Sequence, residues 1–256
     1  MSLIAITREV SPAVAQAQLT HQPRVPIDFA MVQMQHGTYE CELANLGCAV
    51  RRLPVGDNMP DAMFVEDTAV VLDEMAIIAR PGAESRRVET AGVEEALKHF
   101  RLLGHIESPG TLDGGDVLVA GRTLYIGSSG RTNAAGIEQF KRLVEYFGYT
   151  VKPVVVRGCL HLKSAATLVA PDTVLVNRQW IPADAFDGVA IIDVDPSEPG
   201  GANVVMVNDR LLCAEAFPRT CERLAGRGYK VKSVDLSEIA KAEGAVTFCS
   251  LIFQTT

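Results

Sequence analysis

The sequence predicts an α/β fold in which five similar units close into a ring. Three observations support this prediction. A hairpin, a helix and a strand recur in the same order, the starts of the recurring units are separated by 42 to 48 residues, and each start carries polar residues. The unit starts are Glu66, Asp113, His161, Asn203 and Cys249. Because each unit is too small to bury a core alone, we expect neighbouring units to cover one another's apolar faces.

The composition is that of a globular protein. Of the 256 residues, 48% are hydrophobic and 21% are charged, and we expect one domain that spans residues 1–256. The formal net charge of -7 argues against a nucleic-acid partner but not against a small cationic substrate. No apolar run reaches the ~20 residues of a membrane span, and the N-terminus does not have the pattern of a signal peptide. We therefore expect a cytoplasmic protein that does not bind membranes.

The six cysteines do not form the pattern of a metal or disulfide site. None lies in a CxxC pair or in a His/Cys cluster with zinc spacing, and a chain of this length needs no disulfide framework. We expect free thiols, no metal and no cofactor.

The N-terminal segment contains a strand, a long loop and a helix. Residues 3–6 form an apolar run typical of a strand, and the polar, proline-bearing stretch 11–26 has no clean period, which indicates a mobile loop. Asp28 is placed to cap a helix with apolar residues at helical spacing, and Gly47 marks its end. A short strand is expected at residues 50–53.

The first two complete units have the same layout. In the first, apolar runs at residues 64–72 and 75–79 flank a short polar turn and predict a hairpin, and a helix with an apolar face follows at residues 93–100. In the second, a hairpin at residues 113–126 precedes a helix that ends at Gly148. A strand is expected after each helix.

The third and fourth units follow the same order. In the third, a hairpin at residues 167–176 is followed by only a short helical segment and then by a strand at 189–192. In the fourth, a hairpin at residues 204–213 is followed by a helix and by a strand at 229–231.

The fifth unit is incomplete. The C-terminal stretch 244–253 has the apolar content of a short buried strand and carries Cys249 close to the chain end. Because too few residues remain to finish a unit, we expect the N-terminal strand and helix to complete it and to hold the terminus in place.

The polar residues at the unit starts point to one shared cavity. If the starts face the ring axis, carboxylates, a histidine and a thiol converge there. Each residue alone has an ordinary structural explanation, as a turn aspartate, a core histidine or a small buried thiol. Five independent turns have no reason to place them in register, however, so we interpret them as a functional site. The residues concerned are Glu66, Asp67, Asp113, Asp116, His161, Asn203 and Cys249.

Several longer segments resemble a known enzyme family. These segments are residues 64–67, 80–87, 111–117, 130–133, 160–164 and 249–250. They resemble the dimethylarginine dimethylaminohydrolases, which belong to the guanidino-group-modifying superfamily. The resemblance runs from about residue 60 to the C-terminus and implies the five-bladed α/β propeller, or pentein, fold. It also implies hydrolysis of methylated arginine to citrulline and a methylamine through a covalent thiouronium intermediate.

The chemistry of the residues agrees with this resemblance. Carboxylates recognise a planar cationic guanidinium by accepting its N–H groups, a role that suits Asp67 and Asp113. A thiolate at Cys249 would attack the guanidinium carbon, while His161 would protonate the departing amine and then activate water. The resemblance thus implies that Cys249, His161 and Asp113 are catalytic.

The resemblance also implies a set of substrate-binding residues. Arg86 and Arg131 would bind the substrate carboxylate, and Asp61 would bind its ammonium group. Phe64 would pack beside the guanidino group, and the loop 11–26 would close over the site with Leu19 as its lid residue. The complete substrate-binding set is Asp67, Glu66, Phe64, Asp61, Arg86, Arg131, Leu19 and Ala242. A homodimer is possible.

Three other functions stay open. An arginine deiminase uses the same chemistry on arginine but has a longer chain, a noncatalytic propeller would only bind a partner, and amidino transfer differs in the acceptor that reaches the intermediate. Phe248 departs from the family pattern, because some members have a small residue or a second cysteine there. This departure leaves open the preference for methylated arginine over arginine.

Overall fold

The computed structural model describes residues 2–182 and 184–255 and contains five small sheets of three strands each. The strands are β1 (Leu3–Arg8), β2 (Cys48–Leu53), β3 (Ala69–Val71), β4 (Met75–Ile78), β5 (Leu102–His105), β6 (Val117–Ala120), β7 (Thr123–Ser128), β8 (Thr150–Val155), β9 (Ala166–Ala170), β10 (Thr173–Val176), β11 (Ala190–Asp193), β12 (Val204–Val207), β13 (Arg210–Ala214), β14 (Lys230–Val234) and β15 (Leu251–Gln254). The helices are α1 (Phe29–Asn45), α2 (Thr90–Leu97), α3 (Ala134–Val144), α4 (Leu162–Ala165) and α5 (Pro218–Ala225).

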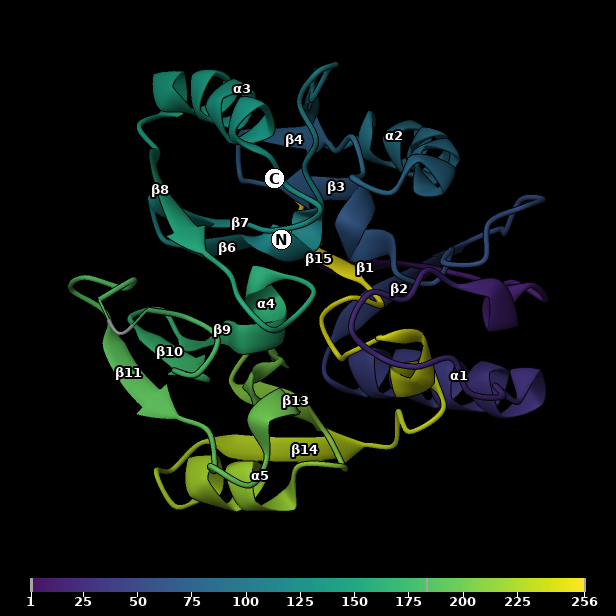
Figure 1. The fold of residues 1–256 in the computed structure, drawn as a ribbon, viewed down its shortest axis with the longest axis vertical. Coiled ribbons are helices and arrows are strands. Elements are labelled where there is room, and N and C mark those ends of the chain that lie inside the picture. The colour runs from purple at the N-terminus through teal and green to yellow at the C-terminus, as the bar shows by residue number, and fades with distance from the viewer. Residues whose placement is uncertain (1, 183, 256) are drawn as a thin grey trace.

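All five sheets have the same construction. An antiparallel pair is joined by a third strand that runs parallel to the middle strand, as in β3-β4-β5 and β6-β7-β8. Figure 1 shows the sheets arranged around a common centre, with α1, α2, α3 and α5 at the periphery and α4 near the middle. The predicted five-fold repeat of a hairpin followed by a parallel strand is therefore confirmed. The short helical segment predicted before residue 189 of the third unit is wrong, because the described residues between β10 and β11 form only turns and bends.

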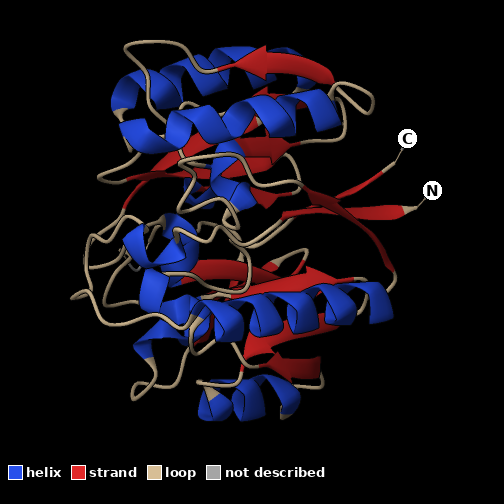
Figure 2. Cartoon of the chain, turned by 90° about the vertical axis from the view of Figure 1, so that its right-hand side faces the viewer, coloured by secondary structure: helices blue, strands red, loops and turns tan. Residues whose placement is uncertain are grey.

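The two ends of the chain form one sheet. Strand β1 pairs antiparallel with β15 and parallel with β2, so this sheet has the order β15-β1-β2. The backbone N–H of Thr255 donates to the carbonyl of Ser2 at 2.9 Å, and Figure 2 shows both termini on the same side of the molecule. The prediction that the N-terminal strand completes the last unit is confirmed.

Helix α1 begins and ends as its sequence signals indicate. The side chain of Asp28 accepts a hydrogen bond from the backbone N–H of Met31, which satisfies one of the free amides of the first turn. Tyr39 and Leu43 are fully buried on the inner face of the helix. Just beyond the end, Gly47 adopts a φ of 101°, a conformation that favours glycine.

The predicted strand at residues 64–72 is wrong in its first half. Residues Val65–Thr68 form a 3₁₀ turn, and strand β3 starts only at Ala69. A strand would place the neighbouring side chains of Glu66 and Asp67 on opposite faces, whereas the turn buries both. The second unit repeats this arrangement, with a 3₁₀ turn at Gly114–Asp116 before β6.

The predicted C-terminal strand is also too long. Only Leu251–Gln254 pairs with β1, and residues 244–250 are not in a strand. Their backbone hydrogen bonds go elsewhere: the N–H of Thr247 donates to Asn203 Oδ1 at 3.0 Å, and the carbonyl of Phe248 accepts from the N–H of Glu66 at 3.1 Å. Cys249 therefore lies in a turn that is tied to two other units.

Neighbouring sheets share their apolar cores. One buried cluster combines Ile6 of β1 and Phe253 of β15 with Ile78 of β4 and Leu97 of α2. This is the mutual burial expected of units that are too small to fold alone. None of the helices among the described residues is both long and apolar enough to cross a membrane.

Candidate active site

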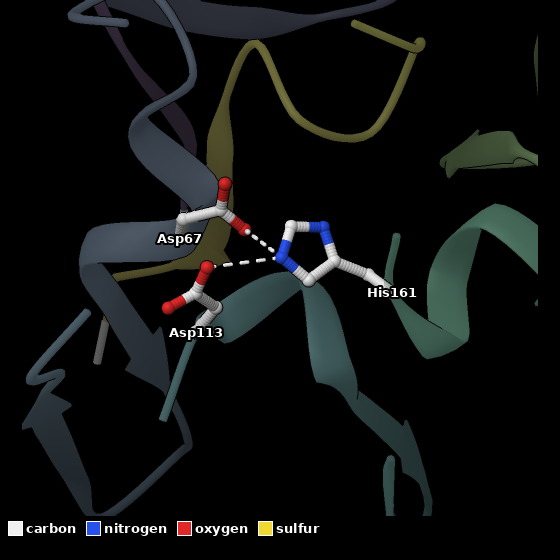
Figure 3. A group of neighbouring side chains, drawn as sticks. All are labelled: Asp67, Asp113 and His161. Carbon is white, nitrogen blue, oxygen red and sulfur yellow. Dashed lines mark hydrogen bonds and ion pairs between the residues drawn. The ribbon is translucent and has the colours of Figure 1, made fainter. Parts of the chain in front are cut away.

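Three buried side chains from three different units meet near the ring centre. His161 Nε2 lies 3.0 Å from Asp113 Oδ2 and 3.7 Å from Asp67 Oδ1 (Figure 3). Asp67 comes from the turn before β3, Asp113 precedes β6, and His161 precedes α4. All three are at most 2% exposed. The predicted convergence of unit starts is therefore observed for these residues.

The two carboxylates favour a protonated His161. Burial alone would lower the pKa of this imidazole, but the charges of Asp67 and Asp113 outweigh burial and raise the pKa to about 9. At neutral pH the ring therefore carries a proton that it can donate. Its Nδ1 atom is buried and has no hydrogen-bond partner in the part of the chain that the structure describes. This nitrogen is therefore the ring atom that the described hydrogen bonds leave unused.

We predict that His161 titrates near pH 9 and that Asp113→Asn lowers the midpoint. Because the raised pKa depends on opposite charge, removal of the Asp113 carboxylate should shift the midpoint towards the ordinary value of about 6.5. The midpoint can be followed by NMR of ¹⁵N-labelled imidazole. As a control, Asp235→Asn removes a distant carboxylate that accepts from Ser237 and Gln35. Equal midpoints in wild type and Asp113→Asn would contradict the charge assignment.

Each acidic group is held by fixed donors. Asp67 accepts from Arg86 Nη1 at 2.5 Å and from the backbone N–H of Gly115 at 3.0 Å. Asp113 accepts from the backbone N–H of Gly82 at 2.8 Å. Burial opposes the ionisation of Asp67, but the charges of His161 and Arg86 outweigh it and lower the pKa. Asp67 is thus an anion with a fixed orientation.

The two glycines of the Asp113-Gly-Gly-Asp116 motif lie too close to neighbouring groups to carry a side chain. A Cβ on Gly115 would lie 2.6 Å from Asp67 Oδ1 and 3.0 Å from His161 Nδ1. A Cβ on Gly114 would lie 2.0 Å from the carbonyl oxygen of Glu66. Both glycines are therefore required by close packing against the acidic cluster, a need that sequence pattern alone did not reveal.

Asp116 holds the backbone that follows His161. Its Oδ1 accepts the backbone N–H of Leu162 at 2.9 Å, and its Oδ2 accepts the hydroxyls of Ser129 and Thr132, both at 2.6 Å. Burial raises the pKa of Asp116 to about 6, although these donors favour its anion. The carboxylate thus fixes the start of α4, directly after His161.

Cys249 is fully buried beside this cluster. Its Sγ lies 3.7 Å from the carbonyl oxygen of Ala245. The preceding residue, Phe248, packs its ring against His161 with centroids 5.4 Å apart and planes at 80°. Burial, followed by the negative charge of Glu66, raises the pKa of the Cys249 thiol. Without a bound cation, Cys249 is therefore a neutral thiol.

Glu66 fastens the turn that carries Cys249. One carboxylate oxygen accepts from Lys163 Nζ and the other from Thr247 Oγ1, each at 2.7 Å. Asn203 Nδ2 donates to the same Thr247 hydroxyl at 2.9 Å. Sequence reasoning placed Glu66 among the substrate contacts but missed the roles of Lys163 and Thr247. The only available signal for Lys163 was its position in the 160–164 segment.

The two arginines expected at the substrate carboxylate have different surroundings. Arg86 is buried, and besides Asp67 it contacts Glu89 and donates to the carbonyl of Phe64 at 2.9 Å. The side chain of Arg131 is 11% exposed, lies 3.7 Å from Asp113 and donates to Thr20 Oγ1 at 3.2 Å. Arg131 therefore faces the loop 11–26, whereas Arg86 mainly orients Asp67.

The remaining predicted contacts lie around this loop. Buried Asp61 accepts the backbone N–H of Gln18 at 3.0 Å, and burial raises the pKa of its carboxyl. Leu19, the next residue, is half-buried. Phe64 and Ala242 are buried in one apolar cluster. No described contact brings Ala242 to the carboxylates.

Asp67, Asp113 and His161 could also offer ligands to a metal ion. One ligand atom from each lies within 4.8 Å of the others, and no further group of this kind occurs among residues 2–182 and 184–255. A histidine must be neutral to bind a metal. Because His161 is protonated at neutral pH and Asp67 is paired with Arg86, the charges favour an ion-paired site.

Comparison with known proteins places the chain in a family. A family model described as "N,N dimethylarginine dimethylhydrolase, eukaryotic" matches residues 16–193, which is more than half of the chain. The chain belongs to the dimethylarginine dimethylaminohydrolase family. The dimethylarginine dimethylaminohydrolase of Streptomyces coelicolor is 41% identical over 96% of this chain and 95% of its own length. That of Pseudomonas aeruginosa is 36% identical over 88% of this chain and 90% of its own.

Solved structures of the dimethylarginine dimethylaminohydrolase family share the fold. A cysteine-to-serine mutant of the Pseudomonas aeruginosa enzyme, complexed with citrulline, superposes with a TM-score of 0.93 at 34% identity, covering 99% of this chain and all of that one. The N-terminal domain of ArgZ, a cyanobacterial arginine dihydrolase, gives 0.89 at 16% identity and covers 98% of that chain, which is a likeness of fold alone. The predicted five-bladed α/β propeller is confirmed.

Proposed function

We propose that the protein hydrolyses N-methylated arginine to citrulline and a methylamine. The observation that carries this proposal is the buried cluster of Asp67, Asp113 and His161 beside the turn of Cys249. Two carboxylates match a planar guanidinium, a protonated imidazole matches a departing amine, and a thiol matches an electron-poor carbon. Membership of the dimethylarginine dimethylaminohydrolase family supports this assignment.

Substrate binding provides the charge that the nucleophile needs. Asp67 and Asp113 accept N–H groups of the guanidinium, and its positive charge then lies close to Cys249 Sγ. A neighbouring cation lowers the pKa of a thiol, so Cys249 releases its proton to solvent when substrate binds. His161 already carries a proton and does not take this one.

The reaction then proceeds in two halves. The thiolate of Cys249 forms a bond to the guanidinium carbon, His161 gives its proton to the substituted nitrogen, and the carbon–nitrogen bond to the methylamine breaks. Water next attacks the resulting thiouronium carbon and gives one proton to His161. The second proton of the water leaves to solvent as the carbon–sulfur bond breaks, which releases citrulline and the thiolate. His161 thus ends protonated, as it began. The unpartnered Nδ1 is the nitrogen that we assign to these transfers.

The amino-acid end of the substrate lies towards the loop 11–26. We assign its carboxylate to Arg131, with Arg86 contributing through its remaining N–H, and its ammonium group to Asp61. Phe64 bounds the guanidino group, and Leu19 covers the site. Glu66 acts through its hydrogen bond to Thr247, and Ala242 packs in the same apolar cluster as Phe64.

The first test compares substrates. We expect citrulline from asymmetric dimethylarginine and monomethylarginine, with one equivalent of the matching amine, in the presence of a metal chelator and without nucleotide. The value of kcat/KM should be highest for a methylated substrate. A higher value for unsubstituted arginine would favour the deiminase alternative, transfer to an added amine would favour amidino transfer, and no turnover would favour a noncatalytic propeller.

A further inference from the structure

Glu243 holds three successive backbone amides of the loop 11–26. Its carboxylate accepts the N–H groups of Thr20 at 3.0 Å, His21 at 2.5 Å and Gln22 at 2.6 Å. Consecutive N–H groups that converge on one anion form a binding nest of the kind that holds phosphates or carboxylates. Here the anion comes from the chain itself, 223 residues away from Thr20.

The backbone of Glu243 is in an unusual conformation. It has a φ of 58°, in the left-handed region, and it ends the 3₁₀ turn Ile239–Ala242. A residue other than glycine in this region costs free energy, which the three hydrogen bonds of the side chain offset. The following residue, Gly244, lies against Phe64, where a Cβ would come within 2.5 Å of the ring. The turn thus connects the loop to the wall of the site.

Other contacts fix the same loop around this point. Asp61 accepts the N–H of Gln18, Arg131 donates to the hydroxyl of Thr20, and Lys241 Nζ donates to the carbonyl of Pro26 at 3.3 Å. Leu19 lies between the residues held by Asp61 and by Glu243. Of these contacts, only Glu243 binds more than one amide of the loop.

We propose that Glu243 is a positioning residue that latches the loop over the active site. Its carboxylate holds residues 20–22 closed, which keeps Thr20 on Arg131, the arginine assigned to the substrate carboxylate. Glu243 itself does not touch the reacting atoms, so it acts on substrate binding through the loop. This inference rests on the proposed function, but the latch exists with or without turnover.

The experiment compares Glu243→Gln and Glu243→Ala with wild type. Hydrogen exchange of the free protein reports the amides of Thr20, His21 and Gln22, and steady-state kinetics with dimethylarginine reports KM and kcat separately. Glu198→Gln is the matched control, because Glu198 also accepts two backbone N–H groups, those of Arg219 and Thr220, at a different unit. The control separates a general loss of stability from release of the loop.

Both Glu243 variants should speed exchange of the three amides by at least about ten-fold and raise KM by about five- to ten-fold, with kcat within about two-fold of wild type. Glu198→Gln should leave the exchange of the three amides, KM and kcat unchanged. Wild-type exchange in both Glu243 variants, or faster exchange with an unchanged KM, would overturn the proposal. A wild-type protein that does not turn over dimethylarginine would instead refute the proposed function, and the exchange result would still report on the latch.

Discussion

Replacement of Cys249 by serine should lower kcat for dimethylarginine by at least about 10⁴-fold. The hydroxyl is far less acidic than the thiol, and His161, which is already protonated, cannot take its proton. Substrate binding should change little, since the carboxylates and arginines remain. The measurements are citrulline formation for kcat and calorimetric titration for affinity.

A buried thiol elsewhere provides the control for this variant. Cys48 of β2 belongs to the same apolar cluster as Cys249 but lies outside the acidic site. Cys48→Ser should retain wild-type turnover within about three-fold, with any loss following its stability. Turnover by Cys249→Ser within ten-fold of wild type would show that another group attacks the guanidinium carbon.

Replacement of Asp113 by asparagine should lower kcat/KM by about 10²- to 10⁴-fold. The variant loses an acceptor for the guanidinium, and it also loses the negative charge that keeps His161 protonated. Because a His161 of lower pKa is still protonated in acid, the ratio of wild-type to variant activity should shrink as the pH falls from 8 to 6. The pH profiles of kcat/KM measure this ratio.

The pH dependence of the loss in kcat/KM distinguishes two roles of Asp113. A loss that is constant across the pH range would mean that the carboxylate only binds the substrate. A loss below ten-fold at all pH values would contradict both roles. Asparagine has the same size as aspartate, so it fits the buried space of Asp113 and can still accept the hydrogen bond from Gly82. A change in activity therefore reports the loss of the charge.

Much of the ring could be predicted from the sequence because the same physical pattern occurs five times. Alternating apolar runs and polar unit starts placed His161 and Asp113 in register before any contact was known, and the distance of 3.0 Å between them agrees with that register. The short fifth unit required the termini to pair, as β1 and β15 do. The repetition thus allowed patterns that are weak in one unit to predict the fold and the site together.

Features that depend on single contacts were not predictable. The turn at Val65–Thr68 lies within the run 64–72, whose other residues are mostly apolar and predict a strand. Only the hydrogen bonds of Glu66 with Lys163 and Thr247 reveal why its side chain points inward. Glu243 looks like an ordinary surface residue in the sequence. Its role requires a left-handed backbone and a loop from the far end of the chain, neither of which leaves a local pattern.

The mass of the enzyme quenched in acid during turnover tests directly whether Cys249 is the nucleophile. We predict a covalent adduct on the peptide that contains Cys249, equal in mass to the substrate minus the departing amine. The adduct from dimethylarginine and from monomethylarginine should have the same mass, because the methylated nitrogen leaves before the intermediate forms, and it should be absent in Cys249→Ser. An adduct on another peptide, or turnover with no adduct under any quench condition, would contradict the claim that Cys249 is the nucleophile.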